Sequence, residues 1–330
     1  MAFACRIIFA CTGPAPHSHP LHPASPTYNS SGQVSGRCRS IYDTSIGIPG
    51  VKIILQSVGE LMPRREMITE TDGNGEFLLD AVAPDSYQVV FQKPGFAEDT
   101  ARFRLRARGR QEINIGLDAL PVLNAAAAFT GHALFGNPIE ERYYLTFDVQ
   151  LTDPDRNLDI ESVEAHFDSL GIIMPLLPNT DHSQWHIQVV LDSLQVSQPS
   201  AYIGTPFSYK VKTNTNFKPK QINFGPFFLV RFIHQKLEIV FPKNDAIVDG
   251  HPVFQWKPVQ VPFPFSYRIL ISRILSPGDF ESTQISDIHA DSTYKRPSRL
   301  LRSKYFWSIS LVDEFGNWTR SREETFEVRQ

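Results

Sequence analysis

The chain has little cysteine: Cys5, Cys11 and Cys38 are the three among 330 residues. Two of them fall within the first 11 residues, so a folded domain contains at most one, and a disulfide framework is excluded. Cys38 stands between two arginines that could lower its pKa. One thiol without a neighbouring base nevertheless favours a partly buried strand cysteine over a reactive one.

An excess of charge of one sign is also absent. The formal net charge is −3, so no basic field would attract nucleic acid, and no nucleic-acid motif is present. A nucleophile elbow, a phosphate loop, a dinucleotide fingerprint and a zinc-protease helix are all missing. His182 and His186 share a face of a predicted strand, but about 13 Å separates them, which is too far to chelate one ion. We therefore predict a protein that is not an enzyme; the alternative is an enzyme with a site at a domain interface.

Turn-forming residues, by contrast, are abundant. The chain has 25 prolines, 19 glycines and an apolar share of 42%, which together favour many short strands around proper cores. The alanine run Ala125–Ala128 is too short to imply a stable helix. The predicted fold class is all-β: three tandem Greek-key β-sandwiches that follow a disordered N-terminal leader.

The most informative motif is the turn within Thr69–Phe77, which contains Asp-Gly followed by Asn-Gly. Such residues accept positive φ at little cost, so the motif predicts a hairpin between two strands. Further strands are expected from the apolar or alternating runs on either side of it. These runs are 34–41, 51–55, 77–79, 87–91 and 113–117.

This segment, residues 33–117, resembles the carboxypeptidase regulatory-like domain family, a transthyretin-like β-sandwich. The resemblance is carried by the turn motif together with Gly36, the Ile48-Pro49-Gly50-Val51 turn, Pro84 with Tyr87, and Gly95-Phe96. It implies a module and no particular activity. Transthyretin-like and starch-binding-like sandwiches are often grouped together, so the resemblance also implies carbohydrate binding as an alternative function.

Two more sandwiches are expected after it. Residues 118–236 alternate on several short strands, including Tyr143–Leu151, and their acidic turn resembles that of bacterial immunoglobulin-like repeats. Residues 237–330 resemble a fibronectin type III-like sandwich, with an early Trp256, a Tyr305 strand and a final turn ending at Asn317. Trp256 and Trp307 are expected in the core, and Trp318 is expected to be partly exposed.

The N-terminus predicts an anchor. The end of segment 1–11, Ile8-Phe9-Ala10-Cys11, resembles a bacterial lipoprotein signal box, which implies lipidation of Cys11. Its apolar part is shorter than the about 7–15 residues of a signal core, and the alternative is an accidental apolar start. Segment 12–32 is rich in proline, serine and histidine and is expected to form an extended tether.

Arginine recurs at every second residue from 102 to 110. On one strand, Arg102, Arg104, Arg106, Arg108 and Arg110 would share one face. A solvated edge strand, protected by charge from edge-to-edge pairing, is one interpretation. The other is an anion-binding ladder for an acidic glycan, a lipid headgroup or the carboxylates of a partner.

No cofactor is expected, with calcium as the one possible exception. Oxygen-bearing side chains lie at alternate positions of one acidic turn, namely Asp153, Asp155, Asn157 and Asp159. Calcium loops need this spacing so that hard oxygen ligands converge on one ion. Leu158 stands where an EF-hand has glycine and strands flank the turn, so the site would be of another type. The alternative is a turn whose carboxylates cap backbone amides.

Together these observations predict a non-enzymatic cell-envelope lipoprotein, a multidomain stalk for binding or scaffolding. Its partner would be a protein or glycan at the envelope, and it would contact the membrane through the lipid anchor alone. A carbohydrate-binding accessory protein is the alternative function.

Overall fold

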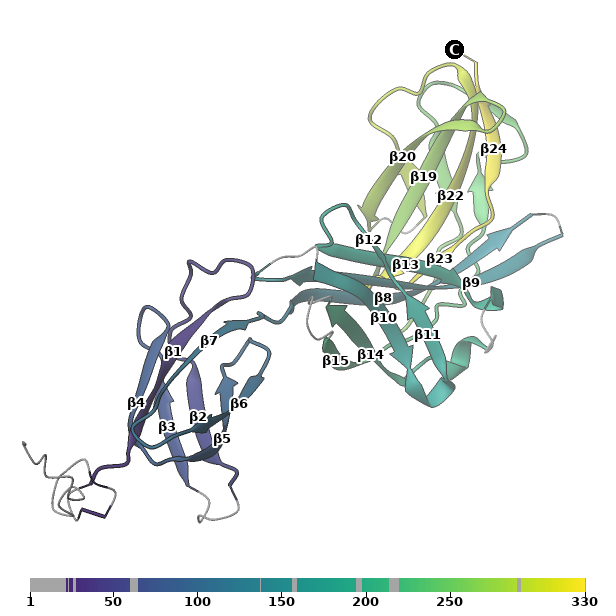
Figure 1. The fold of residues 1–330 in the computed structure, drawn as a ribbon. Coiled ribbons are helices and arrows are strands. Elements are labelled where there is room, and N and C mark those ends of the chain that lie inside the picture. Colours follow the sequence, from purple (N-terminus) through teal and green to yellow (C-terminus); the bar gives the residue numbers. More distant parts are fainter. Residues whose placement is uncertain are drawn as a thin grey trace, which may run out of the picture. The chain divides into compact units, whose positions relative to one another are not determined.

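The computed structural model describes residues 22, 24–25, 28–59, 65–136, 138–155, 159–193, 198–213, 220–289 and 292–329 (Figure 1). The chain forms two compact units, Met1–Leu120 and Pro121–Gln330. Strands dominate both units, and the helical elements of the described residues are short 3-10 turns. The predicted all-β sandwich class is therefore confirmed. None of the described helices is long and apolar enough to cross a membrane.

The first unit is a sandwich of two sheets. One sheet has the order β4-β1-β7 and the other β3-β2-β5-β6, and β1 and β7 pair in parallel. Buried side chains from both sheets, including Ile53, Phe77 and Phe91, pack into one apolar core. The strands are β1 (Gly32–Ser40), β2 (Lys52–Ser57), β3 (Glu66–Glu70), β4 (Glu76–Val82), β5 (Asp85–Gln92), β6 (Asp99–Leu105) and β7 (Arg110–Leu117).

The Asp-Gly-Asn-Gly motif forms the expected tight turn but not the expected hairpin. Gly75 has φ +79°, and the Asp72 carboxylate accepts hydrogen bonds from the amides of Asn74 and Glu76 at 2.9 Å each. The strands on its two sides belong to different sheets, since β3 pairs with β2 whereas β4 pairs with β1. At this crossover the buried Thr71 hydroxyl accepts from the Val51 amide and donates to the Ile48 carbonyl, which holds the chain against the start of β2.

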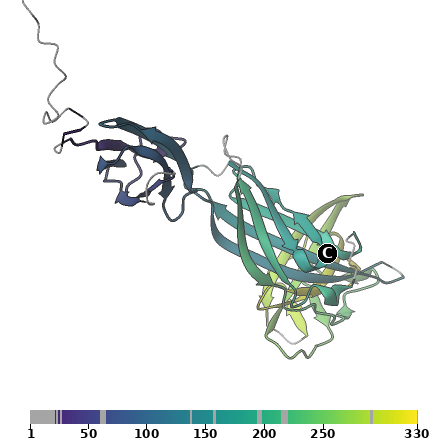
Figure 2. The same ribbon diagram turned by 60° about the horizontal axis from the view of Figure 1, so that its bottom comes forward.

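The second unit contains two cores on one side of a continuous sheet. The path through this sheet is β12-β13-β9-β8-β23-β22-β19-β20, and β24 and β17 continue from β22 (Figure 1 and Figure 2). The sheet β11-β10-β14-β15 covers the first core, and β16-β18-β21 covers the second. The two segments predicted as sandwiches, 118–236 and 237–330, thus contribute strands to one sheet within one unit.

The elements of this unit follow one another along the chain from residue 122 to residue 328. They are β8 (Val122–Phe135), β9 (Glu140–Thr152), β10 (Ile160–Phe167), η2 (Asp168–Leu170), β11 (Ile172–Pro175), β12 (Leu177–Pro178), β13 (Gln184–Val190), η3 (Leu191–Ser193), η4 (Pro199–Ala201), β14 (Pro206–Thr213), β15 (Lys220–Phe228), β16 (Ile239–Phe241), β17 (Ala246–Val248), β18 (Val253–Trp256), β19 (Phe265–Ser276), β20 (Asp279–Ile288), β21 (Thr293–Lys295), β22 (Ser303–Asp313), β23 (Trp318–Arg320) and β24 (Glu324–Val328).

Strand β8, which joins the two halves of the second unit, contains the alanine run. Ala125–Ala128 pair in register with Phe147–Gln150 of β9, and further along β8 Gly131–Ala133 pair in parallel with β23. Alanine has little intrinsic preference for strands, so the pairing with β9 determines the conformation of the run. Gly131 is required at the crossing, because a Cβ there would lie 2.3 Å from the Trp318 ring.

A buried polar seam underlies this crossing. Asn317 accepts a hydrogen bond from the Thr130 amide at 2.9 Å and donates one to the Asp313 carboxylate at 2.9 Å. His132 is fully buried, and its Nδ1 lies 3.0 Å from the Thr319 hydroxyl. The two cores are therefore connected by buried polar groups, most of them hydrogen-bonded, rather than by a continuous apolar interior.

The tryptophans of the second core lie where the sequence places them. Trp256 and Trp307 are buried, and the Trp307 indole donates to the Pro242 carbonyl at 2.7 Å. Trp318 is half-buried and stacks on Tyr144 with ring centroids 5.6 Å apart. The Tyr305 hydroxyl donates to the Leu301 carbonyl at 2.8 Å, the interaction of a tyrosine corner.

Candidate functional site

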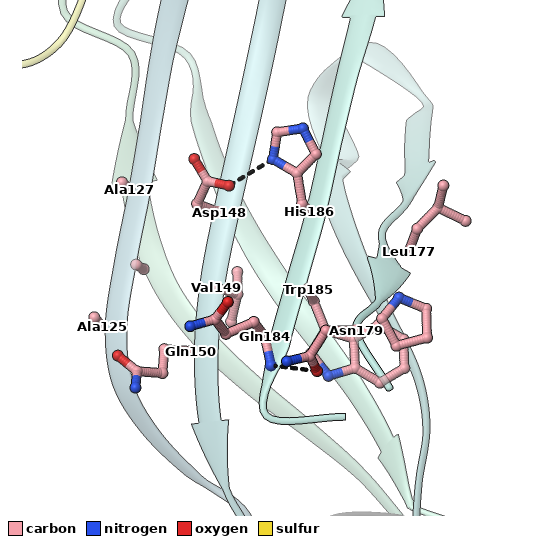
Figure 3. A pocket seen from close by; sticks show the side chains of 12 residues that line it. Ala125, Ala127, Asp148, Val149, Gln150, Leu177, Asn179, Gln184, Trp185 and His186 are labelled. Atoms are coloured by element: carbon pink, nitrogen blue, oxygen red, sulfur yellow. Dashed lines mark hydrogen bonds and ion pairs between the residues drawn. The ribbon is translucent and has the colours of Figure 1, made fainter. Parts of the chain in front are cut away.

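A groove of about 610 Å³ lies on the outer face of β8, β9 and β13 and is closed at one side by β12 (Figure 3). It belongs to the second unit. Its lining residues are Ala125, Ala126, Ala127, Asp148, Val149, Gln150, Leu177, Pro178, Asn179, Gln184, Trp185 and His186.

Strand alternation produces the floor of the groove. Ala126 and Ala128 pack against the first core, which turns Ala125 and Ala127 outward. Gln150 lies opposite Ala125, and Asp148 lies opposite Ala127. The short alanine side chains beside longer ones on β9 leave a hollow, which Figure 3 shows from close by.

An exposed carboxylate–imidazole pair stands at one end of the floor. Asp148 and His186 are directly opposite on β9 and β13, and Oδ1 of Asp148 lies 2.5 Å from Nδ1 of His186. Their side chains are 46% and 59% exposed, so solvent screens the pair and it adds little stability. The groove lining has no serine, threonine, cysteine or lysine beside the pair. The carboxylate can accept hydrogen bonds, and the imidazole can donate and accept them.

Three amide side chains surround the other end. Gln150 and Gln184 are cross-strand neighbours, and Asn179 precedes the turn into β13. The Asn179 side-chain oxygen accepts from the Gln184 amide at 3.1 Å, and its backbone amide donates to the Gln184 carbonyl at 2.8 Å. These bonds fix the direction of Asn179. The exposed side chain of Leu177 adds an apolar wall.

The groove was not predicted from the sequence. His186 was expected on a strand, and it lies on β13 with an exposed side chain. The position of Asp148 on the facing strand depends on the pairing register, which one sequence does not reveal. The available signal was alternation, since Asp148 and Gln150 on β9, and Gln184 and His186 on β13, alternate with apolar residues.

The predicted arginine ladder is wrong in its geometry. Arg102 and Arg104 lie on β6, which ends at Leu105; Arg106 and Arg108 lie in the following turn, and Arg110 begins β7. Arg108 has φ +60°, and Gly109 closes the turn by donating to the Arg106 carbonyl. The five side chains therefore cannot share one strand face. Two of them have local partners: Arg102 binds Gln88, and Arg108 binds the Asn29 carbonyl.

The acidic turn is described only in part, because Asn157 lies outside the described residues. The Asp153 carboxylate accepts from the Asp155 amide at 3.0 Å, which is the turn-capping role considered as the alternative to calcium. One buried oxygen of Asp159 lacks a hydrogen-bond partner. Within the described ranges, no group of three or more His, Cys, Asp or Glu residues is arranged to hold a metal ion. Calcium binding at Asp153–Asp159 stays a prediction.

The remaining candidate residues are cysteines. Cys11 lies outside the described residues, so its lipidation stays a prediction. Cys38 is fully buried in the core of the first unit, and this burial raises the pKa of its thiol to about 12. Its two arginine neighbours do not offset the loss of solvent around the sulfur.

Comparison with known proteins supports the resemblance of the first unit. The family model of the carboxypeptidase regulatory-like domain matches residues 33–118, which confirms the prediction for that segment. No curated protein matches the chain at a significant level.

Solved structures overlap with the chain at low scores. BcpA, the major pilin subunit of Bacillus cereus, is 10% identical with a TM-score of 0.32, over 91% of this chain and 93% of that chain. The FN1–FN3 domains of chicken CNTN1 are 12% identical with a TM-score of 0.31, over 86% and 96% of the two chains. A protein from Bacteroides uniformis described as carbohydrate binding is 10% identical with a TM-score of 0.24, over 58% and 99%. Scores this low carry no information about function.

Proposed function

We propose that the protein is a non-enzymatic binding or scaffold protein of the cell envelope, held at a membrane by a lipid on Cys11. The observation that carries the binding role is the groove on the outer face of β8, β9 and β13. This sheet face is covered by no second layer among the described residues, and its apolar floor and the hydrogen-bonding groups at both ends suit a bound ligand. Support for the anchor comes from the Ile8–Cys11 motif and the proline-rich segment that follows it.

Fractionation tests the anchor. We expect the wild-type chain, expressed in a bacterium that processes lipoproteins, to enter the membrane fraction, and Cys11→Ala to leave it. Cys5→Ala is the matched control, since it changes a cysteine of the same leader outside the motif and is expected to remain in the membrane fraction. An equal soluble distribution of wild type and Cys11→Ala would refute the anchor.

Carbohydrate binding is the second candidate, and the rim of the groove favours it. Amide and carboxylate groups are the partners that sugar hydroxyls use, and Gln150, Gln184 and Asn179 gather there above the alanine floor. We expect binding to a neutral oligosaccharide on a glycan array to be lost in Ala127→Trp, which fills the groove. Gln284→Trp on β20 places the same side chain on an exposed position outside the groove and is expected to keep binding. If both variants lose oligosaccharide binding equally, the binding does not take place in the groove.

A further inference from the structure

A second surface lies on the same outer face, about six residues along β9 from the groove. Three arginines form one transverse row across five strands, and small residues separate them. The row reads Arg142 on β9, Ala133 on β8, Arg320 on β23, Ser310 on β22 and Arg268 on β19, and each member is the direct register partner of the next. We call it the arginine row.

Alternation places the three side chains on the side away from both cores. The neighbours Tyr143, Thr319 and Ile269 face inward, toward the two cores and the seam between them. Arg142 and Arg320 both lie over the ring of Phe135, two residues along β8 from Ala133, at 5.0 and 5.1 Å from its centroid. Two guanidinium groups against one ring confirm that they share a face.

The charges of the row are only partly neutralised. Arg142 pairs with Glu140 at 2.7 Å, and its side chain is 42% exposed. Neither Arg320 nor Arg268 forms an ion pair with any described carboxylate, and the buried Nε of each lacks a hydrogen-bond partner. Like charges held on one rigid sheet repel one another, and a bound anion would relieve this repulsion. Between Arg320 and Arg268 lies the half-buried Ser310, whose hydroxyl could donate to the same anion.

The spacing of the row argues against an acidic peptide. Alternate strands of a sheet are about 9.5 Å apart, so the row presents cationic positions at that interval. Carboxylates on one face of an extended peptide repeat at about 6.6 Å, which does not match. An extended polysaccharide with one acidic sugar in each disaccharide repeats at a length close to the interval of the row.

Aromatic side chains border the row as a sugar ligand would require. Trp318 and Tyr144 precede and follow the row on their strands and stack on each other. On the other side, Phe135, Phe280 and Phe306 line a hollow of about 670 Å³, whose lining also includes Arg322, Glu323 and Glu324. Flat apolar ring surfaces beside fixed charges can contact the apolar faces of sugar rings while the arginines bind their carboxylates.

We propose that the arginine row binds an acidic polysaccharide that carries a carboxylate on alternate sugars. The inference is independent of the lipid anchor and of the ligand of the groove. The ionic part of the binding should weaken as the salt concentration rises. The part that comes from the aromatic contacts should remain.

The test uses the full-length chain and a hyaluronan oligosaccharide, which has one carboxylate in each disaccharide, by titration calorimetry. We expect Arg268→Gln combined with Arg320→Gln to weaken binding by at least about tenfold, because two charge-assisted contacts are lost. Arg296→Gln combined with Arg302→Gln removes the same charge from the same unit outside the row and is expected to bind as wild type does. Both double variants should keep the wild-type melting temperature.

Three further probes decide between ligand classes. A chitin oligosaccharide of equal length is neutral and is expected not to bind. Polyglutamate and vesicles of phosphatidylglycerol supply carboxylate and phosphate charge without sugar, and are expected to bind more weakly than hyaluronan. The groove variant Ala127→Trp should bind hyaluronan normally. Equal affinity of the two double variants, or tighter binding to polyglutamate or vesicles than to hyaluronan, would overturn the proposal.

Discussion

The two units of the chain organise their interiors in different ways. The first encloses a single apolar core between two sheets, and even its cysteine is buried among aliphatic and aromatic side chains. The second places two apolar cores on one long sheet and separates them by the polar seam of Thr130, His132 and Asn317. An apolar core tolerates different side chains if their total volume and the hydrophobic pattern are kept. A seam of hydrogen bonds, in contrast, forms in only one register of strand pairing. The seam therefore specifies how β8 and β23 pair.

The largest expected effect tests whether the shared sheet couples the two cores. Trp307→Ala removes a fully buried indole from the second core and should cost about 3–5 kcal/mol. Because β8 and β23 pair, we expect the first core to lose stability with it. Hydrogen exchange measured by mass spectrometry should accelerate in β9 and β13 as well as in β22.

Phe91→Ala in the first unit is the control, since it empties a comparable volume in a separate core. It should accelerate exchange in β1–β7 and leave β9 unchanged. If Trp307→Ala accelerates exchange in the second core alone, the cores of the second unit are independent and the shared sheet does not couple them.

The second prediction addresses the seam itself. Asn317→Ala removes the acceptor of the buried Thr130 amide and one donor to Asp313, which leaves both buried groups short of a partner. We expect a loss of about 1–3 kcal/mol in the unfolding free energy of the second unit. Tryptophan fluorescence during urea unfolding measures it cleanly, because all four tryptophans lie in that unit. Asn223→Ala on β15, which removes an amide outside the seam, should change the urea midpoint little. Equal midpoint shifts in Asn317→Ala and Asn223→Ala would show that the seam contributes no more to stability than a surface amide.

The fold class and most strands could be predicted from the sequence because alternation and turn residues are local signals. The buried pattern of Tyr143–Leu151 and the buried Trp256 and Trp307 followed from them. Strand β8 was missed, because four alanines carry no strand signal and the pairing of β8 with β23 joins residues 187 positions apart. The arginine repeat also predicts one strand, whereas Arg108 and Gly109 form a turn in the structure.

The candidate surfaces depended still more on register. The groove and the arginine row arise where polar residues of different strands meet, and each strand alone looks ordinary. Arg142 and Arg320 are 178 positions apart in sequence and Arg268 lies between them, yet the three occupy one row. Only the register of five strands reveals this row.

The third prediction is a pH effect confined to the seam. Desolvation lowers the pKa of the buried His132 below its ordinary 6.5, against the opposing influence of Glu141. The folded state therefore binds fewer protons here than the unfolded state, so stability is complete above about 6.5 and decreases as pH falls toward the folded pKa. Tyr143, His234, Lys236 and Thr319 complete its surroundings.

Urea midpoints of the second unit, measured from pH 8 downward, should reveal this decrease. His132→Gln should flatten it, whereas His186→Gln, on the exposed outer face, should leave it in place. The separate decrease from Glu141, whose pKa the hydrogen bond from Lys236 lowers below 4.5, should begin only at more acidic pH. If the urea midpoint decreases equally with pH above pH 5 in the wild type and in both variants, His132 is not the source of the decrease.

The smallest expected effect is an unchanged rate of Cys38 labelling in Trp307→Ala. Cys38 is buried and its thiol has a pKa of about 12, so at neutral pH a thiol reagent reacts with it only when the first unit opens. In a Cys5→Ser, Cys11→Ser background the labelling rate thus reports on that unit alone. Phe91→Ala should accelerate labelling strongly, because it lowers the free energy of opening around the sulfur. Trp307→Ala should leave the rate unchanged, although it destabilises the second unit by several kcal/mol. Faster labelling in Trp307→Ala would mean that the two units unfold together, and the contrast between an isolated core and a coupled pair of cores would then fail.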